Sequence, residues 1–270
     1  MTEPRTAHSV EIELHIDGTL HDVWRAIATA GGISSWMMPT DLDPEPGGRV
    51  VFHMGPDFDS VGKVTHVEAE RRFVYEEDWA AISGNDGAAV GPLVTEFLVE
   101  AHSGGSCTVR VVTSAFGTGA EWENEFFDEL SAGWVPMLDN LRLYVEGFPG
   151  QTASTMWIDP GLSVAPRPAI EAVRDRFGVT AVGDHTERHG IEAVVERSIP
   201  HHVLLRVSTP VTGFFSFLAA GNDDEGGLGL VTYLFGDGAD AYIASHEASW
   251  RDWLRDVIAE VNGIDPGDGS

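Results

Sequence analysis

Apolar and polar residues alternate at the start of this chain. Between Val10 and Ile16 every second residue is apolar, a period that predicts a strand with one wet face. A turn at Asp17 and Gly18 and a helix cap at Thr19 predict a helix over 20–30 that ends at Gly31 and Gly32. Five later segments are rich in β-branched and aromatic residues and are separated by turn formers: 49–54, 61–69, 72–80, 94–101 and 107–115. They predict an antiparallel meander.

A long amphipathic helix is expected after the last of these strands. Apolar residues recur there at steps of three and four: Phe127, Leu130, Trp134, Met137, Leu138, Leu141 and Val145. Such spacing produces a broad apolar face. The meander provides a sheet against which that face can pack.

The turn before this helix occurs a second time. The pattern Phe-Gly-x-Gly-Ala-acid stands at 116–121 and again at 235–240, and each copy leads into a helix that carries Trp134 or Trp250. The two distances from Phe to Trp differ by three residues, about one helical turn, so the apolar positions after the tryptophans stay in phase. We therefore expect two related domains, 1–150 and 151–270, joined in the polar stretch 147–153.

Composition narrows the classes of function. The 43 acidic and 16 basic residues give a formal net charge of −27, and Lys63 is the sole lysine. Such a surface repels nucleic acids and anionic lipid heads, so neither is an expected partner. No apolar run reaches transmembrane length and the start lacks a signal-peptide pattern, which favours a cytoplasmic protein without membrane insertion. The one cysteine, Cys107, has no partner for an internal disulfide.

Motifs of known chemistry are missing from the sequence. It contains no nucleophile elbow, phosphate-binding Gly-rich loop or His-Glu-x-x-His zinc motif. A turn and a helix start explain the Gly-x-Gly pairs at Gly117 and Gly236 more simply than a phosphate site. His185 and His189 have the spacing of zinc ligands on a helix but stand between glycines in an expected loop. We expect no metal, no cofactor and a small buried role for Cys107.

Several motifs together resemble a known superfamily. They are 10–12, the Asp-Val-Trp-Arg-Ala-Ile run at 22–27, Gly-Ile-Ser-Ser-Trp at 32–36, Gly133 with Trp134, and 140–146. In order and spacing they resemble the START-like or SRPBCC superfamily, in the branch similar to the C-terminal domain of the activator of heat-shock-protein-90 ATPase. The resemblance covers 9–147 and implies an α+β helix-grip fold, in which a curved antiparallel sheet wraps the long C-terminal helix around an apolar cavity. The second half lacks the Val-Trp-x-Ala-Ile signature and is shorter between its helices. We therefore expect it to be a diverged copy.

One carboxylate and a set of aromatic rings are the candidate site residues. Strand alternation places Glu77 on the same side as Tyr75 and Trp79, where a buried carboxylate would have a raised pKa and could move a proton. The alternative is a solvated flank. Glu77 is the best catalytic candidate, although no catalytic residue is assigned. The expected ligand-contacting residues are Trp36, Phe52, Tyr75, Trp79, Phe97, Trp122, Phe127 and Trp134.

Three classes of function remain. The first is a non-catalytic binder of a hydrophobic small molecule such as an aromatic polyketide, a lipid or an antibiotic. The second is an enzyme of the polyketide cyclase or aromatase kind, and the third is a chaperone-associated protein-binding module. The absence of a paired base and nucleophile favours the first, and the sequence leaves a homodimer open.

Overall fold

The chain divides into two compact units, the first ending at Thr152 and the second beginning at Ala153. The computed structural model describes residues 5–55, 58–85, 87–222 and 224–264. None of the described helices is long and apolar enough to cross a membrane.

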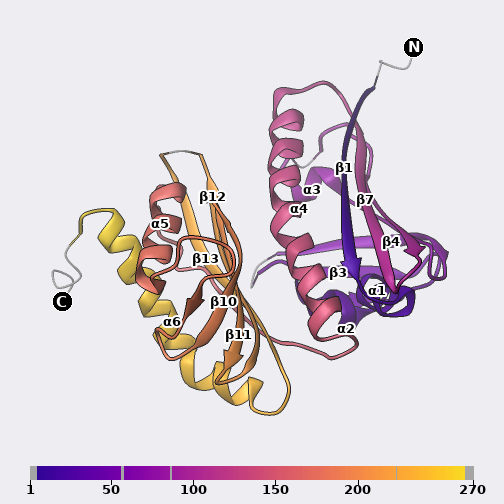
Figure 1. The fold of residues 1–270 in the computed structure, drawn as a ribbon. Coiled ribbons are helices and arrows are strands. Elements are labelled where there is room, and N and C mark those ends of the chain that lie inside the picture. Colours follow the sequence, from indigo (N-terminus) through magenta and orange to yellow (C-terminus); the bar gives the residue numbers. More distant parts are fainter. Residues whose placement is uncertain (1–4, 56–57, 86, 223, 265–270) are drawn as a thin grey trace. The chain divides into compact units, whose positions relative to one another are not determined.

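The first unit is one antiparallel sheet with a long helix beside it (Figure 1). Its elements are β1 (Thr6–Asp17), α1 (Leu20–Ala28), α2 (Ala30–Ile33), β2 (Thr40–Leu42), β3 (Arg49–His53), β4 (Asp59–Glu68), β5 (Arg72–Glu77), α3 (Trp79–Ile82), β6 (Leu93–His102), β7 (Ser106–Gly117) and α4 (Glu121–Gly147). The strand order is β1-β7-β6-β5-β4-β3-β2, so the first strand pairs with the last and the others form the predicted meander. The short strand β2 has no counterpart in the sequence prediction.

The first helix ends earlier than predicted. Thr19 caps it as expected, its Oγ1 accepting from the Asp22 amide at 3.1 Å. The helix then stops at Ala28, because Thr29 is extended and caps a second helix through its Oγ1, which accepts from the Gly32 amide at 3.0 Å. The two glycines predicted to end the first helix lie within the second instead. This brings Ile33 and Trp36 into the core.

The strand predicted over 72–80 also ends early, at Glu77. Asp78 caps a short helix by accepting from the Ala81 amide at 3.2 Å through its carboxylate. Because Trp79 begins that helix, it does not continue the alternation of Tyr75 and Glu77, contrary to the sequence prediction. On this segment the alternation therefore ends at Glu77, the last residue of β5.

A buried carboxylate organises the turn before α4. Glu123 is fully buried and accepts from the amides of Thr118 at 2.6 Å and Gly119 at 2.9 Å. It also accepts from the Thr118 hydroxyl and pairs with His8 of β1 at 2.9 Å. These hydrogen bonds hold the pKa of Glu123 down, at about 2, against the opposing effect of burial. The turn is therefore a structural cap, in line with the expectation from sequence.

The second unit repeats the same plan with fewer residues. It consists of β8 (Ser154–Ile158), α5 (Pro166–Phe177), β9 (His185–Thr186), β10 (Glu192–Ile199), β11 (His202–Thr209), β12 (Thr212–Gly221), β13 (Gly226–Phe235) and α6 (Ala239–Val261). Its strand order, β8-β13-β12-β11-β10-β9, again pairs the first strand with the last. Trp250, Leu254 and Val257 of α6 are buried in its core. The predicted fold, two tandem helix-grip units, is confirmed.

Candidate ligand cavity

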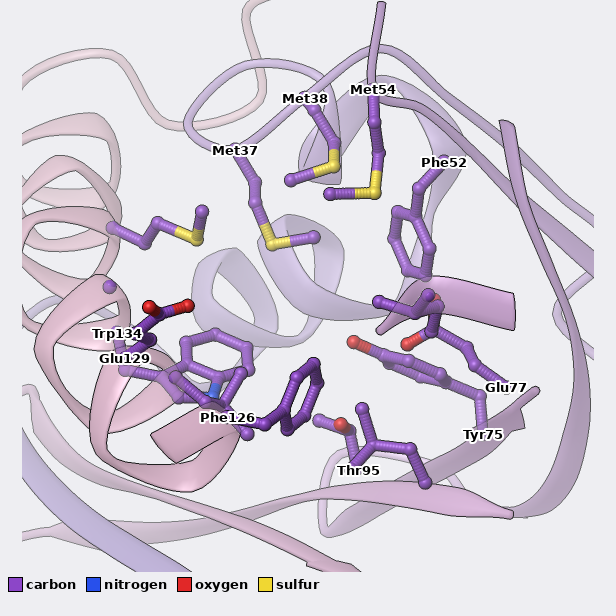
Figure 2. A pocket seen from close by; sticks show the side chains of 15 residues that line it. Met37, Met38, Phe52, Met54, Tyr75, Glu77, Thr95, Phe126, Glu129 and Trp134 are labelled. Atoms are coloured by element: carbon purple, nitrogen blue, oxygen red, sulfur yellow. The ribbon is translucent and has the colours of Figure 1, made fainter. Parts of the chain in front are cut away.

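A cavity of about 290 Å³ lies in the first unit between the sheet and α4. Its walls come from the segment after α2, from strands β3, β5 and β6, from α3 and from the middle of α4 (Figure 2). The lining residues are Met37, Met38, Phe52, Met54, Tyr75, Glu77, Ile82, Leu93, Thr95, Phe126, Glu129, Leu130, Gly133, Trp134 and Met137. Most of this surface is apolar.

Methionine is concentrated around the cavity. Of the six methionines in the chain, four line it: Met37, Met38, Met54 and Met137. Figure 2 shows Met37, Met38 and Met54 grouped on one side of the space, next to Phe52. Methionine is unbranched and polarisable, so its side chain adapts to ligands of irregular outline and contacts aromatic faces well. This wall can therefore adjust to a ligand.

The aromatic part of the lining is held more rigidly. Trp134 donates from Nε1 to the Thr113 hydroxyl at 3.2 Å, and its ring meets Phe97 edge-on with centroids 5.9 Å apart. Tyr75 packs against Phe52 at 5.2 Å between centroids. Fixed rings of this kind present flat apolar surface at little cost in conformational entropy.

The cavity has polar groups on its sheet wall, from β5, and on the opposite side, from α4. Tyr75 and Glu77 stand side by side, with Glu129 across the space beside Trp134 (Figure 2). Burial raises the pKa of Glu77 to about 7, while a hydrogen bond from the Ser60 hydroxyl acts in the opposite direction. Burial and the neighbouring Glu77 charge raise the pKa of Tyr75 well above its usual value, although a hydrogen bond with Thr95 opposes them. At neutral pH the wall thus offers a phenol and a carboxyl group that is about half protonated.

Gly133 leaves room for the cavity in the middle of α4. A Cβ built on this glycine meets no other atom within 4 Å, and its backbone is ordinary helix. Glycine inside a helix costs about 1 kcal/mol relative to alanine. Any side chain at this position would project from a lining residue of the cavity and take up part of its volume.

The structure brings together part of the predicted site. Glu77 lines the cavity, as do three of the eight predicted contact residues, Phe52, Tyr75 and Trp134. Trp36 and Phe97 are instead buried behind the wall, where Trp36 donates to the Ala26 carbonyl at 2.9 Å. The other three rings pack with one another beside the cavity, Trp79 lying 5.1 Å from Trp122 and 5.4 Å from Phe127 between centroids.

Sequence reasoning missed the methionine wall and Gly133. The signal for the methionines was present, because Met37 and Met38 are adjacent and four of only six methionines converge. Nothing in the sequence indicates that Gly133 faces a cavity. Its orientation depends on how α4 is rotated against the sheet.

The remaining candidates stay outside this site. Cys107 is buried in β7, where burial raises the pKa of its thiol. His185 lies in the two-residue strand β9, and His189 has a φ of 55°. No group of three or more His, Cys, Asp or Glu side chains suited to a metal ion occurs in the described part of the chain.

Comparison with proteins of curated function finds none that matches this sequence. Among solved structures, protein MLL2253 from Mesorhizobium loti is 22% identical with a TM-score of 0.43, covering 50% of this chain and 94% of its own. The Aha1 dimer from Colwellia psychrerythraea is 16% identical with a TM-score of 0.42, covering 53% and 99%. DynU16, described as a putative protein in the dynemicin biosynthetic locus, is 14% identical with a TM-score of 0.42, covering 94% and 98%.

The sequence of the first unit also matches a protein-family model. The model described as Activator of Hsp90 ATPase homolog 1-like protein matches residues 17–146. That range runs from the end of β1 to the end of α4 and so contains every residue that lines the cavity. The first unit therefore carries the sequence pattern of the Activator of Hsp90 ATPase homolog 1-like family, the branch of the START-like superfamily that its motifs resemble.

Proposed function

We propose that the first unit binds a hydrophobic small molecule, of the aromatic polyketide, lipid or antibiotic type, and that binding rather than catalysis is its role. The observation that carries the proposal is the cavity of about 290 Å³, lined by methionine and aromatic side chains with a few polar groups on its walls. Concave, mostly apolar sites with a few well-placed polar atoms are typical of small-molecule binding.

The shape of the cavity supports a ligand with a flat part. Trp134 and Tyr75 offer ring faces and edges that are already held in place by Thr113 and Phe52. Because little ordering remains to be done on binding, such a site loses little affinity to conformational entropy. The methionines can then adapt to the rest of the ligand.

The proposal assigns binding to the first unit. A titration of the full-length protein with N-phenyl-1-naphthylamine tests for this binding. The dye is neutral and aromatic, and its fluorescence increases in apolar sites. We expect saturable binding at one site, which the cavity-filling variant Gly133→Leu weakens. A matched change on the exposed last residue of the same helix, Gly147→Leu, should leave the affinity unchanged.

Native mass spectrometry of the protein purified from its own host complements the titration. A retained small molecule that the dye displaces would identify the ligand class directly. If the dye does not saturate and no molecule is retained, or if Gly133→Leu and Gly147→Leu bind the dye equally well, the proposal fails.

A second candidate function is an enzyme of the polyketide cyclase kind. It is favoured by Glu77, a carboxyl group in the cavity wall whose pKa of about 7 suits proton transfer near neutral pH. Replacing Glu77 by Gln removes the ionisable proton and keeps the size. In a binder the affinity should change by about 1 kcal/mol, whereas in an enzyme turnover should fall about 100- to 10,000-fold without loss of binding.

A further inference from the structure

The charges around the cavity all have one sign. Glu77 lies in the sheet wall and Glu129 stands on α4 across the space (Figure 2). No lysine, arginine or histidine is among the described residues that line the cavity. An anionic ligand would meet only like charge there, which costs affinity, while a cationic one would be attracted from both sides.

One atom in the wall is left without a partner. The Ser60 hydroxyl donates to Oε1 of Glu77, and no described residue donates a hydrogen bond to the other carboxylate oxygen, Oε2. Glu77 is partly buried, and it lines the cavity. A ligand that enters the cavity and donates to this oxygen would gain a charge-assisted hydrogen bond.

The rings and sulfur atoms add to the same preference. The side chains of Trp134, Tyr75 and Phe126 line the cavity, and an ammonium group is attracted to the negative face of an aromatic ring. The thioether sulfur atoms of the methionines are weak hydrogen-bond acceptors and cannot donate, so they also suit a cation better than an anion.

We propose that the cavity selects a lipophilic amine, an apolar molecule with an aromatic portion and one protonated amino group, whose ammonium pairs with Glu77. This inference rests on the proposed binding function and specifies its ligand class. In it Glu77 is the specificity-determining residue, Glu129 attracts the cation towards the cavity, and the methionine and aromatic walls hold the apolar part.

The protonation state of Glu77 should change when an amine binds, and this change can be measured separately from the affinity. With a pKa of about 7 the carboxyl group is about half protonated at pH 7, and a bound ammonium favours the ionised form. Amine binding should therefore release about half a proton at pH 7 and tighten as the pH rises from 6 to 8. A ligand that accepts a hydrogen bond from protonated Glu77 would show the opposite dependence.

Other titratable or charged groups near Glu77 could also contribute to the pH dependence of binding. Its charged and titratable neighbours in the two hollows that it lines are Tyr75, Glu129, Lys63, Glu76 and Asp78. Tyr75 stays neutral across this pH range, because its pKa is raised. His53, which pairs with Asp59 at 2.8 Å and has a raised pKa, titrates nearby but does not line the cavity. A Glu77→Gln variant separates its effect from that of Glu77.

The experiment compares three compounds on one ring system by isothermal titration calorimetry of the full-length protein. They are 9-(aminomethyl)anthracene, which is cationic, 9-anthracenemethanol, which is neutral, and 9-anthracenecarboxylate, which is anionic. We expect the amine to bind about 10- to 100-fold more tightly than the alcohol, the range of a charge-assisted hydrogen bond. The carboxylate should bind most weakly.

Two variants then assign the preference to a residue. Glu77→Gln should abolish the advantage of the amine over the alcohol, together with the proton release measured in buffers of different ionisation enthalpy. Glu76→Gln is the matched control, since the neighbouring residue on β5 does not line the cavity, and it should leave both quantities unchanged.

The outcomes separate this inference from the proposed function. If the alcohol binds but the amine binds no better, or if Glu77→Gln keeps the preference for the amine, the amine proposal is overturned while hydrophobic binding stands. If none of the three compounds binds, both fail.

Discussion

Filling the cavity from α4 is the most direct test of the site. Gly133→Ala should stabilise the protein by about 1 kcal/mol, because alanine replaces glycine inside a helix. A Cβ there meets no atom within 4 Å, so no clash opposes the gain. For a unit of about 150 residues this corresponds to a rise in Tm of about 3 °C.

Gly133→Leu extends the same change into the cavity. Its three further carbons can be buried at about 0.8 kcal/mol each, which sets an upper limit near 3 kcal/mol for the total stabilisation. A ligand must then share the space with this side chain, and overpacking costs about 1 to 3 kcal/mol, or about 5- to 150-fold in affinity. The variant should thus be more stable than the wild type and bind more weakly.

Thermal unfolding and dye titration on the same samples measure both effects. Gly147→Ala and Gly147→Leu, on the exposed last residue of α4, control for helix propensity and added apolar surface. The reasoning is refuted if Gly133→Leu lowers Tm, since a clash would then exist where the structure has open space. Unchanged dye affinity in Gly133→Leu would equally show that the ligand does not use this cavity.

Three further changes test other parts of the fold and site. Trp134→Ala should cost about 3 to 5 kcal/mol in unfolding free energy and weaken dye binding, because it truncates a buried ring; unchanged denaturant midpoints and dye affinity would contradict this. Glu123→Gln should remove a carboxylate whose lowered pKa of about 2 stabilises the fold above pH 4.5, a contribution that disappears as the pH falls towards 2. Urea unfolding should therefore show a loss at pH 6 that shrinks at pH 3, and an equal loss at both would refute the assignment. Because the folded pKa of Glu77 is raised to about 7, its ionisation lowers stability as the pH rises from 4.5 to 7. Glu77→Gln should hence be more stable relative to the wild type at pH 8 than at pH 5, by up to about 3 kcal/mol, and a pH-independent difference would count against it.

Local patterns in the sequence predicted the elements and their repetition. Alternation located β1 and the meander, and steps of three and four residues located α4. The duplicated turn indicated two units, and Trp250 is buried in α6 as the in-phase apolar positions require. These predictions succeed because the period of a strand or helix is a property of consecutive residues.

Alternation also located Glu77 correctly and then failed two residues later. Both residues were assigned to one side of one strand, but the Asp78 carboxylate caps a helical turn at Ala81 and takes Trp79 out of the strand. A side-chain hydrogen bond to the backbone overrides a pattern based on hydrophobicity alone. The error in strand length accounts for the wrong placement of one predicted contact residue.

Only the tertiary structure decided which apolar residues border the cavity and which fill the core. Trp36, Phe97 and Trp134 are all buried, yet only Trp134 reaches the cavity. The open space beside Gly133 and the convergence of four methionines likewise arise where α4, the sheet and the segment after α2 meet. The sequence by itself determined the strands, the helices and their duplication, because these depend on neighbours along the chain. The cavity depends on the distances between elements far apart in the chain, which local periodicity does not encode.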